Sequence, residues 1–113
     1  MGKAANSSIS LKQIHVTDNF WNKYVHLVKD VIIPYQWDIL NDKLEDVETS
    51  HCIENFKIAA GEKEGEFQGA VFQDTDVAKW LEAGGFVLNY ERDEKLEELA
   101  DETIELIGRA QQP

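Results

Sequence analysis

A chain of 113 residues suffices for one domain or for part of one, and its 42% hydrophobic content argues against an intrinsically disordered protein. The 22 Asp and Glu against 11 Lys and Arg give a formal charge of -11, which repels phosphate backbones and anionic membrane surfaces and so disfavours nucleic acid as a partner. No stretch approaches the roughly 18 consecutive apolar residues of a membrane span, so we expect none.

Residues 1–14 are small and polar and lack a sustained apolar period, and we interpret them as a leader ahead of a helical unit at residues 15–113. They lack the apolar run of a signal peptide, which favours a cytoplasmic location. Cys52 is the single cysteine, so no internal disulfide can form and no cysteine-based metal framework can be drawn from this chain. We therefore predict no metal site and no cofactor within these residues.

The first predicted helix starts after Asp18, which can cap it, because apolar residues then recur at helical spacing. These residues form one apolar face: Trp21, Tyr24, Val25, Val28, Val31 and Ile32. Pro34 interrupts or kinks this helix, and residues 35–40 can resume it because proline is tolerated in a first turn. A shorter helix is predicted from Ser50 to Ala60, with Gly61 as its terminator.

Residues 62–69 contain two glycines and no period, so we predict a loop there. A further helix is capped by Asp74 or Thr75 and carries the glycine pair 84–85. Each glycine weakens it by roughly 1 kcal/mol and indicates either a close helix contact or tolerated damage. After a turn at residues 89–93, the last helix has the clearest period, with one apolar face: Leu96, Leu99, Ala100, Thr103, Ile104, Ile107 and Ala110. The predicted fold class is all-α.

Several blocks of sequence follow one another along the chain: VIIPYQW at residues 31–37 with Asn41-Asp42, AAGE at 59–62, EFQG at 66–69, VFQDTDVAKWLEA at 71–83, and residues 101–112 of the last predicted helix. In order and spacing these blocks resemble glycoside hydrolase family 127. The block at residues 101–112 resembles the helix that in the family runs into an Asp-Gly-Tyr-Leu turn. One departure is local, since the family usually has Ala-Ala-Tyr where this chain has Gly84-Gly85-Phe86.

The resemblance covers about residues 14–113 and implies the N-terminal helices of an (α/α)6 six-hairpin barrel of several hundred residues, followed by β-sandwich domains. It implies an enzyme that releases terminal β-L-arabinofuranose with a cysteine nucleophile, zinc bound by cysteines and a glutamate, and a glutamate acid/base, all beyond residue 113. Cys52 takes none of these roles, because the family's nucleophile lies in a cysteine-rich segment without a counterpart here. A truncated barrel leaves apolar helix faces without partners, so we expect self-association or loose packing.

Four residues in the VFQDTDVAKWLEA block are predicted to bind substrate: Gln73, Asp74, Asp76 and Trp80. An amide and carboxylates at a helix start can bond sugar hydroxyls, although capping and packing also explain the two aspartates. Trp21, Trp37 and Trp80 can stack on a sugar ring, but their helical spacing beside aliphatic residues favours a core role. His51 beside Cys52 does not make a zinc site, because neighbours on a helix diverge. Nor can two aspartates in one helical turn flank a glycosidic bond.

Two functions of different classes follow from these observations. The first is the N-terminal portion of a β-L-arabinofuranosidase, inactive alone, whose full-length form acts on carbohydrate and holds zinc. The alternative is a free-standing acidic helical module that binds a protein partner through its surplus apolar faces, which predicts saturable partner binding. Hydrolysis by the short chain itself is not expected, because no nucleophile with an adjacent base is visible.

Overall fold

The computed structural model describes residues 7–113, and their regular structure is entirely helical, which confirms the all-α prediction. The elements in chain order are the 3-10 helix η1 (Leu11–Gln13), α1 (Asn19–Leu27), the π-helix η2 (Val28–Ile32), α2 (Ile33–Leu40), α3 (Cys52–Ala59), α4 (Thr75–Tyr90) and α5 (Glu94–Ala110). Residues 1–6 of the predicted leader lie outside the described residues, and η1 occupies part of the rest. Within residues 7–113, no helix combines the length and the apolarity needed to cross a bilayer.

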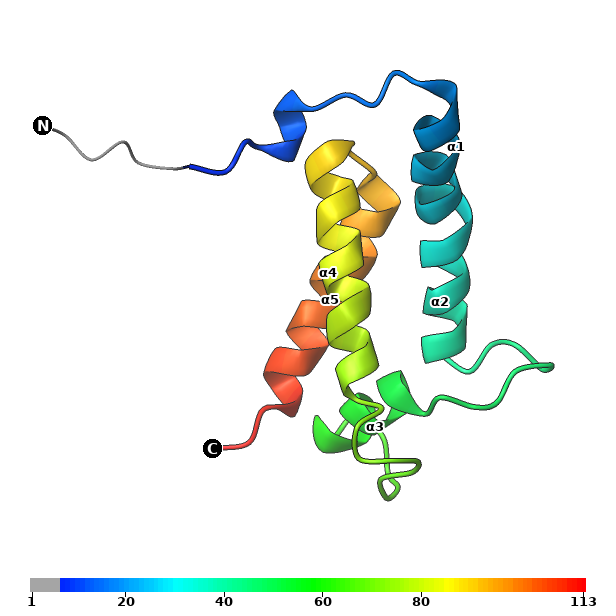
Figure 1. Cartoon of the computed structure of the whole chain (residues 1–113). Helices are drawn as coiled ribbons and strands as arrows, with labels where there is room; N and C mark the ends of the chain where they lie inside the picture. Colours follow the sequence, from blue (N-terminus) through cyan, green and yellow to red (C-terminus); the bar gives the residue numbers. More distant parts are fainter. Residues whose placement is uncertain (1–6) are drawn as a thin grey trace, which may run out of the picture.

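The segments α1, η2 and α2 form one continuous helix, drawn from blue to cyan in Figure 1. It begins as predicted, with Asp18 Oδ1 accepting a hydrogen bond from Trp21 N at 2.8 Å. Pro34 lies in the first turn of α2, directly after the π turn. A π turn is one of the local adjustments that lets a helix continue past a residue without an N–H, so Pro34 does not interrupt the helix.

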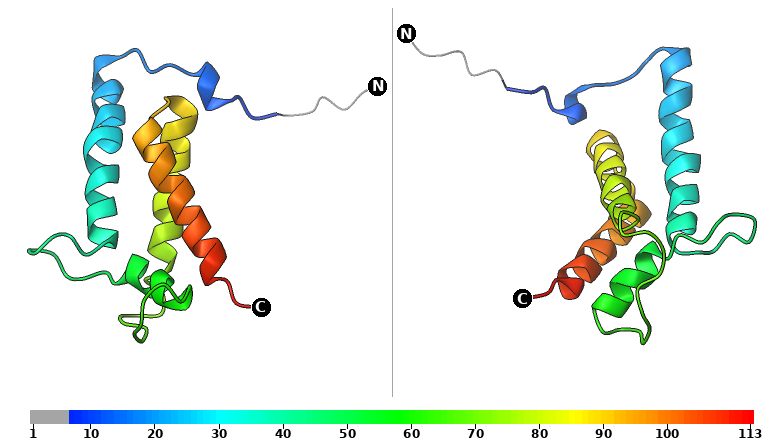
Figure 2. Two further views of the ribbon diagram at one scale, coloured as in Figure 1. Left: turned by 180° about the vertical axis from the view of Figure 1, so that it is seen from behind. Right: turned by 60° about the horizontal axis from the view of Figure 1, so that its bottom comes forward.

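The other long helices, α4 and α5, form an antiparallel hairpin, and Asp93 caps the second by accepting from Leu96 N at 3.1 Å. α2 packs against α4, while α3 lies across the base and contacts both α4 and α5 (Figures 1 and 2). The core fills the space where they meet and consists of Ile33, Leu40, Cys52, Ile53, Val77, Trp80, Leu96 and Leu106. A Cβ on buried Gly84 would lie 3.7 Å from Leu96 Cδ1, an ordinary contact, so the glycine pair is tolerated rather than required by close packing.

The end of α3 follows the prediction that Gly61 terminates it. Gly61 has φ +73, and its N–H donates to Ile58 O at 3.0 Å while Glu62 N donates to Lys57 O at 2.9 Å. This pair of bonds is a Schellman motif, in which a glycine turns the chain out of the helix and the last carbonyls are satisfied. The predicted loop follows directly and leads to α4.

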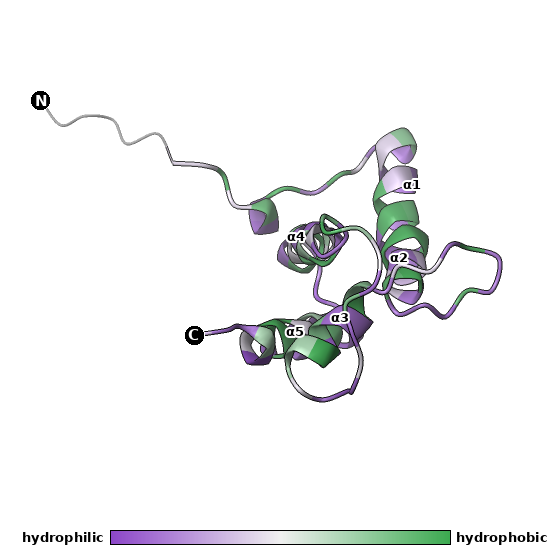
Figure 3. Cartoon of the chain, turned by 90° about the horizontal axis from the view of Figure 1, so that it is seen from below, coloured by the Kyte–Doolittle hydropathy of each residue, from purple (hydrophilic) through white to green (hydrophobic). Residues whose placement is uncertain are grey.

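Apolar positions predicted on the inner faces of the first and the last helix are exposed in the structure. Trp21 is 62% exposed, and none of the residues of α1 and η2 is buried, because the end of α4 borders this side of the helix across a cavity without packing closely against it. Figure 3 shows apolar segments on this helix, and a cavity lined by Trp21 of α1 and Phe86 of α4 lies between the two helices. Ile104 is 56% exposed, and Leu106 is buried in its place, because α3 and α4 contact α5 on the side that carries Leu106.

Candidate functional site

The predicted substrate-binding residues lie at the start of α4 and along its first turns. Gln73 is the last but one residue before the helix, and its side chain folds back so that Oε1 accepts from Ala70 N at 2.7 Å. Gly69 makes this possible, since it has φ +89 and a Cβ there would overlap Gln73 Oε1. The amide of Gln73 thus uses its oxygen within the loop, while no hydrogen bond from its Nε2 to another described residue is found.

Asp74 and Asp76 have different surroundings, although the sequence treats them alike. Asp74 stands at the N-cap position, but its backbone is already helical at φ -60 and ψ -25, and its side chain makes no capping bond. Asp74 Oδ1 is buried without a hydrogen-bond partner among the described residues. Asp76 Oδ1 instead accepts from Lys79 Nζ at 2.8 Å in an exposed pair. The predicted side-chain cap is therefore absent at Asp74, and Thr75 donates its hydroxyl to Phe72 O at 2.7 Å rather than capping.

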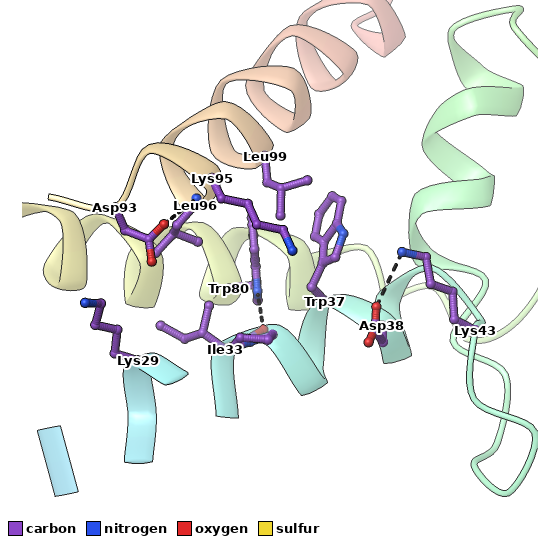
Figure 4. Close-up of a pocket in the computed structure, with 11 residues that line it drawn as sticks. Lys29, Ile33, Trp37, Asp38, Lys43, Trp80, Asp93, Lys95, Leu96 and Leu99 are labelled. Atoms are coloured by element: carbon purple, nitrogen blue, oxygen red, sulfur yellow. Dashed lines mark hydrogen bonds and ion pairs between the residues drawn. The ribbon is translucent and has the colours of Figure 1, made fainter. Parts of the chain in front are cut away.

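Trp80 has the core position that its spacing favours. It is 2% exposed, and its Nε1 donates to Ile33 O at 3.1 Å, which ties α4 to α2. Its ring lies 4.6 Å from that of Trp37, tilted by 35°. Both indoles line a cavity of about 260 Å³ between α2, α4 and α5, with Lys29, Lys43 and Lys95 around it (Figure 4).

The four predicted residues do not converge on one cavity. Asp76 and Trp80 share a second cavity of about 400 Å³ between α2 and α4, which Gln36 and Lys79 also line. Gln73 and Asp74 lie before the helix and contact α3 instead, through the Cys52 thiol. A role in substrate binding for the four residues stays a prediction.

Cys52 lies at the start of α3 and is completely buried. Its Sγ donates to Gln73 O at 3.3 Å, and burial, followed by the nearby carboxylates of Asp74, Asp76 and Asp42, raises the pKa of the thiol to about 11. A thiol with that pKa is protonated near neutral pH and closed to substrate, so Cys52 is unsuited to be a nucleophile or a metal ligand.

The His, Cys, Asp and Glu side chains of the described residues do not gather into a metal site. Within residues 7–113, no group of three or more His, Cys, Asp or Glu side chains is placed to hold a metal ion. His51 Nδ1 lies 3.6 Å from Asp42 Oδ2, and the same carboxylate accepts from Ser50 N and His51 N, which stabilises the turn before α3. The zinc that the family resemblance implies therefore has no fitting set of ligands in this part of the chain.

Asn55 is the residue of the site that sequence reasoning missed. It is 5% exposed, and its carboxamide makes two hydrogen bonds to the backbone of Gln68 in the loop before α4. The available signal was a polar residue between Ile53 and Phe56 on the apolar side of a short helix, where an amide needs a buried partner.

Comparisons with known proteins agree with one another. The chain matches the family model described as β-L-arabinofuranosidase, GH127 catalytic domain, over residues 13–113. It is 40% identical over 111 residues to a non-reducing end β-L-arabinofuranosidase of Bifidobacterium longum subsp. longum, covering 88% of this chain and 17% of that enzyme. Its fold is similar to the crystal structure of a GH127 β-L-arabinofuranosidase from Geobacillus stearothermophilus T6, with a TM-score of 0.86 and 58% identity, covering 89% of this chain and 16% of the other. The chain thus spans about a sixth of the length of these relatives.

Proposed function

The chain belongs to the GH127 family of β-L-arabinofuranosidases, and we propose that it is the N-terminal portion of the catalytic domain of an enzyme that releases terminal β-L-arabinofuranose. The observation that carries this proposal is the match to the catalytic-domain model over residues 13–113, together with a fold that superposes on a GH127 enzyme. The carbohydrate substrate follows from the activity named for both relatives.

The open apolar face of the first helix supports the same proposal. Phe20, Trp21 and Val31 are each more than half exposed, and the rings of Phe20 and Trp21 lie 5.1 Å apart. Large exposed apolar side chains that gather on one helix mark a surface that another part of a protein covers. In an (α/α)6 barrel each helix packs on neighbours, so further helices of the enzyme would cover this face. The isolated chain, lacking that cover, is expected to associate with itself.

The catalytic chemistry is proposed to reside outside these residues. A cysteine nucleophile bound at zinc and a glutamate acid/base are the groups implied by the family, and zinc would supply thiolate stabilisation when bound. Cys52 does not fit this role, because its pKa of about 11 keeps the thiol protonated. We therefore propose that the chain alone is inactive.

The contribution of this chain to the active site is proposed to be substrate binding through Gln73, Asp74, Asp76 and Trp80. Gln73 Nε2 is a donor for a sugar hydroxyl, and the carboxylates are acceptors. The buried Asp74 Oδ1 supports a role beyond capping, because an acceptor without a donor costs roughly 1–3 kcal/mol and calls for a function that offsets it. Trp80 would contribute indirectly, because its buried ring and its hydrogen bond to Ile33 O hold the first turns of α4 against α2.

Hydrolysis of p-nitrophenyl β-L-arabinofuranoside tests the activity. We expect release of nitrophenol by the enzyme that contains this segment and none by the purified 113-residue chain, with or without zinc and reductant. Turnover by the chain alone would show that the catalytic groups are placed wrongly here, and an inactive whole enzyme would contradict the proposed substrate. If a stable chain instead bound a protein partner saturably, the alternative of an interaction module would replace the enzyme proposal.

Substitutions in the whole enzyme test the substrate-binding residues. Asp74→Asn and Asp76→Asn should each raise KM by about 10- to 100-fold, since a hydrogen bond to a charged group contributes about 1.5–3 kcal/mol. Gln73→Ala should raise KM by about fivefold, since a neutral hydrogen bond contributes about 1 kcal/mol. Glu82→Gln is a matched control, because Glu82 is an exposed carboxylate on the same helix that lines none of the described cavities. A KM unchanged from that of the control removes the substituted residue from the site.

A further inference from the structure

The loop that leads to the proposed binding residues is attached to α3 by a buried amide. Asn55 Nδ2 donates to Gln68 O at 2.8 Å, and Gln68 N donates to Asn55 Oδ1 at 3.0 Å. The two bonds satisfy both backbone groups of one loop residue, much as a neighbouring strand would. Because Asn55 is 5% exposed, these bonds are shielded from water, and removing the amide would leave the Gln68 groups without a partner.

A second attachment lies five residues further along the loop. The Cys52 thiol donates to Gln73 O at 3.3 Å, and Cys52 and Asn55 are three residues apart, on the same face of α3. Between the two points, Gly69 turns the chain and Gln73 Oε1 closes onto Ala70 N. One face of a short helix therefore holds both ends of the segment 68–73.

We propose that Asn55 is a positioning residue of the enzyme, which sets the place of Gln73 by fixing the backbone at Gln68. This inference rests on the proposed function, in which Gln73 Nε2 donates to a hydroxyl of the arabinofuranoside. The Gln73 oxygen is bound to Ala70 N, so the direction of Nε2 follows the loop backbone and not the free rotation of the side chain. Pinning that backbone removes conformational entropy before the substrate arrives, which is how a preorganised donor strengthens binding.

Amide hydrogen exchange in the 113-residue chain tests the attachment without any activity. Asn55→Ala should speed exchange at Gln68 and Ala70 at least tenfold relative to exchange in the middle of α5. Asn41→Ala is the matched control, because Asn41 also donates its side-chain amide to a backbone oxygen, Trp37 O at 2.9 Å, but away from the loop. Equal loop exchange in the two variants would overturn the proposal, since Asn55 would then only add general stability.

Kinetics in the enzyme that contains this segment complete the test. Asn55→Ala should raise KM by about two- to fivefold, no more than Gln73→Ala does, while kcat stays within about twofold, and Asn41→Ala should change neither. The outcomes also separate the two proposals. If Gln73→Ala leaves KM unchanged, the assignment of Gln73 fails, whatever Asn55 does; if Gln73→Ala raises KM but Asn55→Ala does not, positioning by Asn55 fails and the function stands.

Discussion

Replacing Gly69 by alanine should destabilise the chain through two separable effects at the start of the candidate site. Gly69 has φ +89, where an L residue is strained by about 1–2 kcal/mol. The added Cβ would also overlap Gln73 Oε1, so the amide must leave its bond to Ala70 N, a further loss of about 1 kcal/mol. We therefore expect Gly69→Ala to lower the free energy of unfolding by about 2–3 kcal/mol.

The second effect can be isolated with a matched glycine. Gly61 has φ +73 but no atom within 4 Å of an added Cβ, so Gly61→Ala should show the backbone strain alone. In urea denaturation, Gly69→Ala should then cost about 1 kcal/mol more than Gly61→Ala, and this difference should vanish when both are made in a Gln73→Ala background. If the two glycine variants cost the same while Gln73 is present, the packing of Gln73 against Gly69 does not contribute and the reasoning is wrong.

Three further outcomes are expected. Gly85→Ala should raise the free energy of unfolding by about 0.5–1 kcal/mol in the same denaturation assay, because an added Cβ meets no atom within 4 Å in the middle of α4. The thiolate absorbance of Cys52 at 240 nm should titrate near pH 11, and an inflection below pH 9 would contradict the buried thiol. Because the folded chain keeps the thiol neutral, the free energy of unfolding should fall between about pH 9 and pH 11, and Cys52→Ala should lack this loss. Trp21→Ser should reduce self-association in sedimentation experiments, because Trp21 lies on the open face, whereas Phe67→Ser, also exposed but in the loop, should not.

Local chemistry explains why the limits of most helices were predictable. Asp18 and Gly61 act through atoms within five residues of themselves, so the sequence contains everything needed to place a cap and a terminator. Pro34 shows the limit of this reasoning. The missing N–H of Pro34 is also a local feature, but a helix can accommodate it either by breaking or by forming a π turn. In this chain the π turn keeps the helix continuous.

Burial was less predictable than helix limits, because it depends on which other segments are present. Helical periodicity places Trp21 and Ile104 on apolar faces correctly, yet it does not say whether anything covers those faces. The role of Asn55 could not be predicted for a related reason. Its partners are backbone atoms of a loop with no periodic pattern, so the contact that links α3 to Gln73 could not be read from the residues on either side.

The charge of the chain is divided in a way that bears on how the open face is covered. Residues 1–40 carry four Lys and three Asp, a net charge of +1, whereas residues 41–113 carry seven Lys and Arg against nineteen Asp and Glu, a net charge of -12. The exposed carboxylates of α5, among them Glu97, Asp101 and Glu105, therefore belong to the acidic part, while α1 and α2 belong to the nearly neutral part. Repulsion between exposed charges is screened beyond about 8–10 Å at moderate salt. Further helices can therefore approach the open face without strong repulsion from the carboxylates of α5. Burial of apolar area, not charge pairing, is thus the dominant contribution to covering this face, and substitutions of its aromatic residues should weaken that packing far more than changes in salt.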